Sequence, residues 1–256
     1  MSHDALAPGD CSKRARINLF MAAFPATRHS IVAAMRSPRP DDRRAAFDAL
    51  ITAYWKPVFK YVRLKWQASR EEAEDLTQGF FMRAFEQDFF AAFDPSRARF
   101  RTYLRTCLDR FVANARKADA RLKRGGGVTP IPIDFAEAER ELRLQSSNAI
   151  EDFDAYFHRE WLRGLFAAAA DRLRAACLER GRADRFTVFE QYDLASDEGA
   201  RPTYSELAHR LGLSQGDVTN ELAAARREFR RHVLEALREQ CATDEEFAAE
   251  SQALTG

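Results

Sequence analysis

Residues 93–124 read FDPSRARFRTYLRTCLDRFVANARKADARLKR. The opening four residues, Phe93 to Ser96, are typical of a turn. From position 100 onward, apolar residues recur at every third or fourth position, as they do along one side of an α-helix. We expect this apolar stripe to pack inward, leaving the cationic side chains on the flanks and the exposed side of the helix. The stripe comprises Phe100, Tyr103, Leu104, Cys107, Leu108, Phe111 and Val112.

Positive charge is concentrated in the same stretch. Residues 97–124 contain ten Lys or Arg and two Asp, a formal charge of +8, whereas the whole chain carries +1. The rest of the chain therefore carries −7. Charged helix faces are usually solvated and linked by internal salt bridges. Two anions within the stretch cannot neutralise ten cations, however, so we interpret it as a phosphate-binding face.

The composition excludes several classes of protein. The 256 residues, 46% of them hydrophobic, suit one large domain or two small ones. No apolar run reaches the roughly 18 residues that a membrane span needs. The four cysteines lie far apart and the five histidines form no metal-binding pattern, so we expect reduced thiols, no metal and no cofactor. No nucleophile has an obvious base partner, and we expect a cytoplasmic protein that is not an enzyme.

Helical periodicity recurs from Asp41 to Gln240 and strand signals are nearly absent, which predicts an all-α fold. Pro57 should kink the first helix or break its hydrogen-bond ladder. A second helix should begin near Ser69, because Ser69 and Glu72 have the spacing of a capping box. The expected buried stripes are Phe47, Leu50, Ile51, Tyr54, Val58, Tyr61 and Val62 in the first helix, and Leu76, Phe80, Phe81, Ala84 and Phe85 in the second.

Two short helices joined by a tight turn are predicted near the C-terminus. A capping box at Thr203 starts the first, Gly212 can adopt the left-handed conformation that ends it, and Ser214 can cap the second. This pattern is typical of a helix-turn-helix, whose second helix normally enters the DNA major groove. A helical hairpin used only for packing is the alternative.

These elements predict two small helical domains joined by a flexible linker. Residues 1–25 are expected to be an N-terminal tail, 26–124 the first domain and 125–149 a linker with its boundary in the Gly- and Pro-rich stretch from Gly125. Residues 150–240 form the second domain, beginning with a long helix over Ile150–Arg180, and 241–256 form a C-terminal tail.

The chain resembles an extracytoplasmic-function (ECF) sigma factor, a two-domain bacterial transcription-initiation factor. The first half of the resemblance lies in EDLTQGFF at 74–81, FDPSR at 93–97 and FRTYL at 100–104, and the second in YSELA at 204–208 and LGLS at 211–214. Residues 26–30, ATRHS, also look like the Thr-Arg-Trp-Ser start of one ECF-like subgroup. The family implies a sigma region 2 helical bundle and a sigma region 4 helix-turn-helix.

The resemblance also implies partners and site residues. It assigns Asp75, Leu76, Thr77 and Gln78 to binding the clamp helices of the core RNA polymerase β′ subunit. Capture of the minus-ten promoter element falls to Phe93, Arg97, Arg99, Arg101, Tyr103, Arg105, Arg110, Asn114, Arg116 and Lys117, with the two aromatics as stacking candidates. Contact with the minus-thirty-five element falls to Gln215, Gly216, Thr219, Asn220, Arg226, Arg227, Arg230 and Arg231, beside the β flap.

Relatives usually carry basic residues where this chain has Thr219 and Glu221, and many carry Asn where it has Arg110. The promoter sequences therefore stay open. Regulation could come from an anti-sigma factor, a kinase, or packing of the acidic remainder of the chain over the basic helix. A repressor or activator that binds duplex DNA without polymerase is the main alternative function, and a helical protein-interaction module is another.

Overall fold

The computed structural model describes residues 30–87, 89–119, 133–144, 152–194 and 201–255. These residues form helices joined by turns and loops, with no strand among them, which confirms the all-α prediction. The helices are α1 (Ile31–Ala34), α2 (Pro40–Lys65), α3 (Arg70–Glu86), η2 (Phe89–Ala92), α4 (Phe100–Asp119), α5 (Phe135–Leu144), α6 (Phe153–Glu179), α7 (Ala183–Phe189), η3 (Glu190–Leu194), α8 (Tyr204–Leu211), α9 (Gln215–Gln240) and α10 (Asp244–Thr255). None of them is apolar over the length that a bilayer crossing would need.

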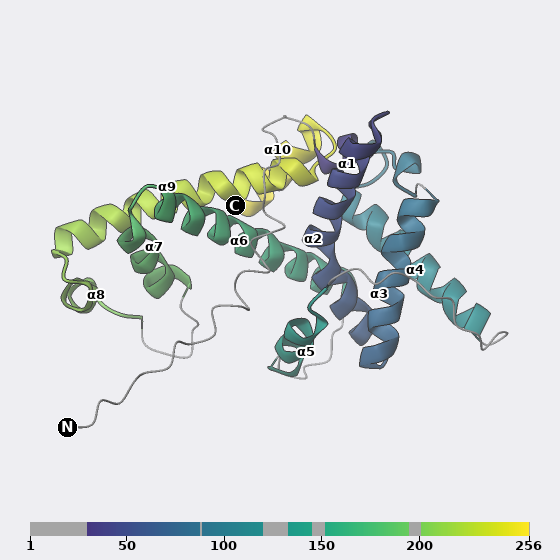
Figure 1. The fold of residues 1–256 in the computed structure, drawn as a ribbon, viewed down its shortest axis with the longest axis horizontal. Helices are drawn as coiled ribbons and strands as arrows, with labels where there is room; N and C mark the ends of the chain where they lie inside the picture. The colour runs from purple at the N-terminus through teal and green to yellow at the C-terminus, as the bar shows by residue number, and fades with distance from the viewer. Residues whose placement is uncertain (1–29, 88, 120–132, 145–151, 195–200, 256) are drawn as a thin grey trace, which may run out of the picture.

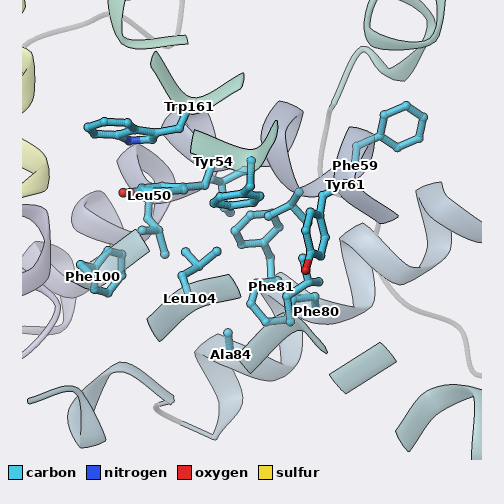
Figure 2. Close-up of a cluster of buried hydrophobic side chains, with 14 of the residues drawn as sticks. Leu50, Tyr54, Phe59, Tyr61, Phe80, Phe81, Ala84, Phe100, Leu104 and Trp161 are labelled. Atoms are coloured by element: carbon cyan, nitrogen blue, oxygen red, sulfur yellow. The ribbon is translucent and has the colours of Figure 1, made fainter. Parts of the chain in front are cut away.

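The larger hydrophobic core forms around α2, which α3, α5 and α6 contact (Figure 1). All seven apolar residues predicted for the buried stripe of α2 are buried. Aromatic side chains fill much of this core, and Figure 2 shows Tyr54, Phe80, Phe81 and Phe100 gathered around Leu104. Aromatic pairs at these separations add to the stability that burial provides, as in the edge-to-face contact of Tyr54 and Phe100, whose ring centroids lie 5.9 Å apart.

Helix α2 continues through Pro57, although proline has no N–H to donate to the carbonyl of Ala53 four residues earlier. Helix α6 covers this point. A Cβ added at Gly164 would lie 3.8 Å from the oxygen of Ala53, so α6 passes close to the carbonyl that has lost its usual helical donor. The proline therefore interrupts the hydrogen-bond ladder without ending the helix.

A smaller core lies where α7, α8 and the first part of α9 meet the last part of α6. Helices α6 and α9 run side by side and contribute to both cores, as the long pair in Figure 1 shows. The predicted second domain, residues 150–240, thus includes Phe157, Trp161 and Leu165, which pack in the core of the first. The structure differs here from two bodies connected only by a linker.

Two segments expected to lack structure contain helices. Within the predicted linker, residues 135–144 form α5, which packs on α2 through Phe135 and Ala138. Glu139 of α5 also accepts hydrogen bonds of 2.9 and 2.8 Å from the Arg63 guanidinium. Within the predicted C-terminal tail, residues 244–255 form α10. The expected hinge at Gly125–Gly127, the N-terminal tail and residues 26–29 lie outside the described residues.

Candidate nucleic-acid interface

The apolar stripe of α4 has two rows that differ in burial. Phe100, Leu104, Leu108 and Val112 follow one another at intervals of four and are at most 1% exposed. Tyr103, Cys107 and Phe111 form the neighbouring row and are half-buried. The prediction that the stripe packs inward is confirmed for the first row. The second row lines a groove on the surface.

This groove, of about 700 Å³, lies between the end of α3, η2 and the outer side of α4. Aromatic carbon and polar side chains alternate along it, a combination that suits a nucleotide because the aromatics can stack on bases and the polar groups can bind base edges or phosphates. The lining residues are Arg83, Gln87, Phe89, Ala92, Tyr103, Cys107, Arg110, Phe111, Asn114, Ala115 and Ala118. Of the residues proposed from sequence, the groove brings together Tyr103, Arg110 and Asn114.

Tyr103 is held in place within the groove. Its hydroxyl donates a hydrogen bond of 2.7 Å to the carbonyl of Phe89, which ties α4 to η2. Burial raises the pKa of Tyr103 to about 12, so the hydroxyl stays protonated at neutral pH. Its ring also packs against that of Phe93, with centroids 5.3 Å apart. The half-buried ring of Tyr103 is thus a fixed wall of the groove.

Phe93 has a different position from the one its proposed role requires. Its side chain is 3% exposed and packs edge-to-face on Phe100 at 5.3 Å. The predicted turn is present: Asp94 accepts hydrogen bonds of 3.0 Å from the backbone N–H of Ser96 and 2.7 Å from its hydroxyl. The turn directs Phe93 inward as an anchor. In this conformation Phe93 cannot stack on a base.

Four of the seven cations that the structure describes between Arg97 and Lys117 are paired, contrary to the charge argument. The pairs are Arg99 and Arg101 with Glu250, Arg105 with Asp109 and Asp154, and Arg116 with Glu72. The argument counted only the anions within the stretch, whereas three of these partners, Glu72, Asp154 and Glu250, come from other helices. Arg97, Arg110 and Lys117 are exposed and have no ion pair with a carboxylate of the described residues.

Eight groove residues were not identified from the sequence, among them Arg83, Gln87, Phe89 and Phe111. Arg83 and Gln87 lie one turn apart at the end of α3, and the Nε of Arg83 donates to the Oε1 of Gln87 at 3.2 Å. Phe111 belongs to the apolar stripe and was assigned to the core, as was Phe85. Phe85 is 52% exposed and has one ring contact, with Phe47 at 4.8 Å. No periodic pattern distinguishes such boundary positions from core positions.

The predicted polymerase-binding segment lies in α3 with its two middle positions turned inward. Asp75 is exposed and Gln78 half-buried, whereas Leu76 is 7% exposed and Thr77 fully buried. Ser69 caps this helix as predicted, accepting from the N–H of Glu72 at 3.1 Å. Only Asp75 and Gln78 of the four can contact another molecule without a change in the helix.

The two predicted C-terminal helices, α8 and α9, are joined by a tight turn. Thr203 and Glu206 form one capping box, Ser214 and Asp217 a second, and Gly212 adopts a φ of 67° between them. A φ in this range favours glycine. Val218, Leu222 and Ala225 of α9 face the smaller core. The opposite face exposes Gln215, Gly216, Thr219, Asn220, Arg227, Arg230 and Arg231.

Several charged side chains on α9 are engaged by neighbouring helices, and two of them bear on the predicted DNA contacts. Glu221 accepts hydrogen bonds from Arg182 at 3.2 Å and from Arg185 at 2.6 Å. Arg226 donates two hydrogen bonds, of 2.8 and 2.9 Å, to the carboxylate of Asp193. Glu221 is therefore paired with cations of the protein itself. Arg226 is already neutralised.

The basic helix borders a groove lined by aromatic and polar side chains, a combination that suits single-stranded nucleic acid. Residues 50–122 match the family model for sigma-70 region 2, and this segment contains α3, η2 and α4 with the whole groove. The match supports a member of the sigma-70 family, with a role in RNA polymerase binding and promoter melting. No curated protein and no solved structure matches the chain.

Proposed function

We propose that this protein is an alternative sigma factor of the ECF type, which binds core RNA polymerase, recognises a promoter and helps to open its strands. The observation that carries the proposal is the groove beside α4, because it lies wholly within the segment that matches sigma-70 region 2. Its aromatic walls and polar groups suit an unpaired base of the minus-ten element, and exposed Arg97, Arg110 and Lys117 can bind the strand's phosphates.

The proposed polymerase contact is the exposed part of α3. Asp75 and Gln78 lie on the surface of the same helix that ends at the groove, so one rigid element would connect the clamp helices of the β′ subunit to the captured strand. Leu76 and Thr77 support this surface from within the core. An anti-sigma factor or a kinase could act on the same face.

The helix-turn-helix supports recognition of the minus-thirty-five element. The first two turns of α9 expose Gln215, Thr219 and Asn220, where base edges of duplex DNA are usually reached. Amide side chains bind adenine with two hydrogen bonds. Arg227, Arg230 and Arg231 lie farther along the exposed side and suit phosphates. Since α6 and α9 are shared between both cores, the two DNA-binding surfaces belong to one packed unit in this conformation.

The test is association with core polymerase, measured by size-exclusion chromatography of the purified components. We expect a complex for the natural chain and weaker association for Asp75→Asn combined with Gln78→Ala. Glu86→Gln is the matched control, because Glu86 is an exposed carboxylate at the other end of α3. Binding of duplex DNA without any association with polymerase would instead identify a repressor or activator.

The groove is tested with a fluorescent single-stranded oligonucleotide. Replacing Asn114 or Arg110 by alanine should weaken binding, and Arg110→Ala should also lower the salt dependence, by about 0.7 in the slope of log K against log salt if its phosphate contact is lost. Arg143→Ala, an exposed arginine on α5 away from the groove, is the control. Equal affinity of all three variants would exclude the groove as the strand-binding site.

A further inference from the structure

The C-terminal helix α10 places a carboxylate on the N-terminus of the basic helix. Glu246 accepts a hydrogen bond of 2.9 Å from the backbone N–H of Phe100, the first residue of α4. Its second carboxylate oxygen accepts from the N–H of Ala242 at 2.8 Å. The first N–H groups of a helix have no partner within the helix and carry partial positive charge. Glu246 therefore satisfies a donor that is suited to any anion.

A second carboxylate of α10 binds the two arginines that flank this N-terminus. The side chain of Glu250 is 3% exposed and forms ion pairs with Arg99, at 2.9 Å, and with Arg101. Arg101 also lies over the ring of Trp161 in α6, 4.9 Å from its centroid. Both arginines were expected to bind the minus-ten element. In this structure, both form ion pairs with the same buried carboxylate.

The N-terminus of α4 and its two arginines, which α10 covers, have the chemistry of a phosphate-binding site. Backbone N–H groups at a helix N-terminus together with arginine side chains bind phosphate oxygens readily. The carboxylates of Glu246 and Glu250 stand where the oxygens of a DNA backbone phosphate would bind. A strand and α10 cannot both occupy the start of α4.

We propose that α10 is an intramolecular competitor of promoter DNA, which covers the start of α4 until the strand displaces it. This inference rests on the proposed function, since it assigns Arg99 and Arg101 to DNA in the displaced state. In the closed state, with α10 in place, Arg99 and Arg101 are not available to DNA. The groove and the exposed cations Arg97, Arg110 and Lys117 remain accessible, so binding can begin there.

The contacts that hold α10 in place are suited to its reversible displacement. Of its larger apolar side chains, Phe247 and Leu254 pack against the core and both are only partly buried. The other contacts are polar, including the ion pair of Asp244 with Arg238. The free energy of opening therefore depends in part on charged groups that DNA phosphates can replace. Cys241, 3% exposed where α9 meets α10, would become accessible on opening.

The first experiment compares Glu250→Gln with Glu245→Gln. Both remove one negative charge from α10, but Glu245 is exposed and has no ion pair with the described part of α4. We expect Glu250→Gln to raise the affinity of the full chain for single-stranded DNA about tenfold, because a larger fraction is open before binding, and Glu245→Gln to leave it nearly unchanged. Equal affinity of the two variants would overturn the proposal.

The second experiment measures opening without relying on DNA affinity. Burial raises the pKa of Cys241 to about 12, so its thiolate is scarce in the closed state and its reaction with a maleimide, followed by peptide mass spectrometry, should be slow. Glu250→Gln should accelerate labelling of Cys241, and so should saturating single-stranded DNA added to the natural chain. Cys177, 1% exposed in the smaller core, reports general unfolding and should stay slow in all samples.

The outcomes separate the two proposals. If DNA binds the natural chain but does not accelerate labelling of Cys241, then α10 stays in place and the competitor role is wrong, while the proposed function stands. If neither the natural chain nor Glu250→Gln binds DNA or polymerase, the proposed function is wrong and the competitor role falls with it. Accelerated labelling of both Cys241 and Cys177 would show that the variant unfolds. Tighter DNA binding by that variant would then no longer support the competitor role of α10.

Discussion

Lys60 of α2 and Glu160 of α6 form an ion pair of 2.6 Å in which the side chains are only 1% and 2% exposed. Glu141 of α5 accepts from the same ammonium group at 2.7 Å, so three helices meet at one buried cation. Buried charges are tolerated only when they are paired and hydrogen-bonded. The contact fixes α6, and with it the helix-turn-helix, onto the core of the first domain.

We expect Lys60→Met to destabilise the protein by about 3–5 kcal/mol, because it leaves the buried carboxylate of Glu160 without its main partner. Adding Glu160→Leu should recover part of this loss. Lys56→Met is the matched control, since Lys56 lies one turn earlier, is 29% exposed, and pairs with the same Glu141. It should change stability by about 1 kcal/mol or less. Urea unfolding of the four proteins measures these differences, and similar losses for Lys56→Met and Lys60→Met would contradict the expectation.

Local patterns predicted the helices well because their signals are local. The caps at Ser69, Thr203 and Ser214 and the turn at Gly212 depend on neighbours a few residues away. The pairing of Lys60 with Glu160 depends on residues a hundred positions apart, and sequence periodicity contains no information about such partners. For the same reason, the ion pairs of Arg99 and Arg101 with Glu250 could not be foreseen.

The candidate site was predicted in part. Tyr103, Arg110 and Asn114 were identified because they lie on the basic helix, and the structure adds the opposite wall from α3 and η2. Phe93 was given a surface role because the resemblance to ECF sigma factors made it a candidate for stacking on a base. Its ring instead enters the core between Phe100 and Tyr103. The direction of a side chain that follows a turn depends on the packing it meets.

Gly79 of α3 offers a way to alter the groove without changing its charges. A Cβ at this position would lie 3.3 Å from Cζ of Phe111, which lines the groove and can shift toward open space. We expect Gly79→Ala to raise the free energy of unfolding by about 0.5 kcal/mol, since alanine favours a helix interior, while weakening binding of single-stranded DNA.

Gly164→Ala serves as the control for this substitution. A Cβ there has its nearest contact at an ordinary 3.8 Å and lies in α6, away from the groove. This variant should gain similar stability, measured by thermal unfolding, and keep the natural affinity measured by fluorescence anisotropy. Unchanged affinity in both variants would show that the position of Phe111 does not matter for binding.

The ion pair of Arg63 with Glu139 predicts that the stability of the protein depends on pH. The hydrogen bonds from Arg63 lower the pKa of Glu139 below its ordinary value of 4.5. Because the carboxylate is favoured in the folded state, its contribution is complete above about pH 4.5 and is lost as the pH falls through the lower pKa of the folded protein. Glu139→Gln should therefore lose stability at pH 7 and converge with the natural chain once the pH falls below the lowered pKa of Glu139. Urea unfolding at several pH values measures the difference in stability between the two proteins. A difference that stays constant across this range would contradict the role assigned to Glu139.

Arg226 and Arg227 are adjacent in sequence but should behave differently on duplex DNA. Arg227 is exposed and has no ion pair with a carboxylate of the described residues, so its phosphate contact would release a counterion, and Arg227→Ala should reduce the salt slope by about 0.9. Arg226 already binds Asp193 and lies 5.5 Å from the centre of the Tyr192 ring. Arg226→Ala should therefore lower stability by about 1 kcal/mol or less while changing the slope by a smaller amount. Titrations at several salt concentrations measure both slopes, and an equal reduction would mean that Arg226 leaves Asp193 for the DNA backbone.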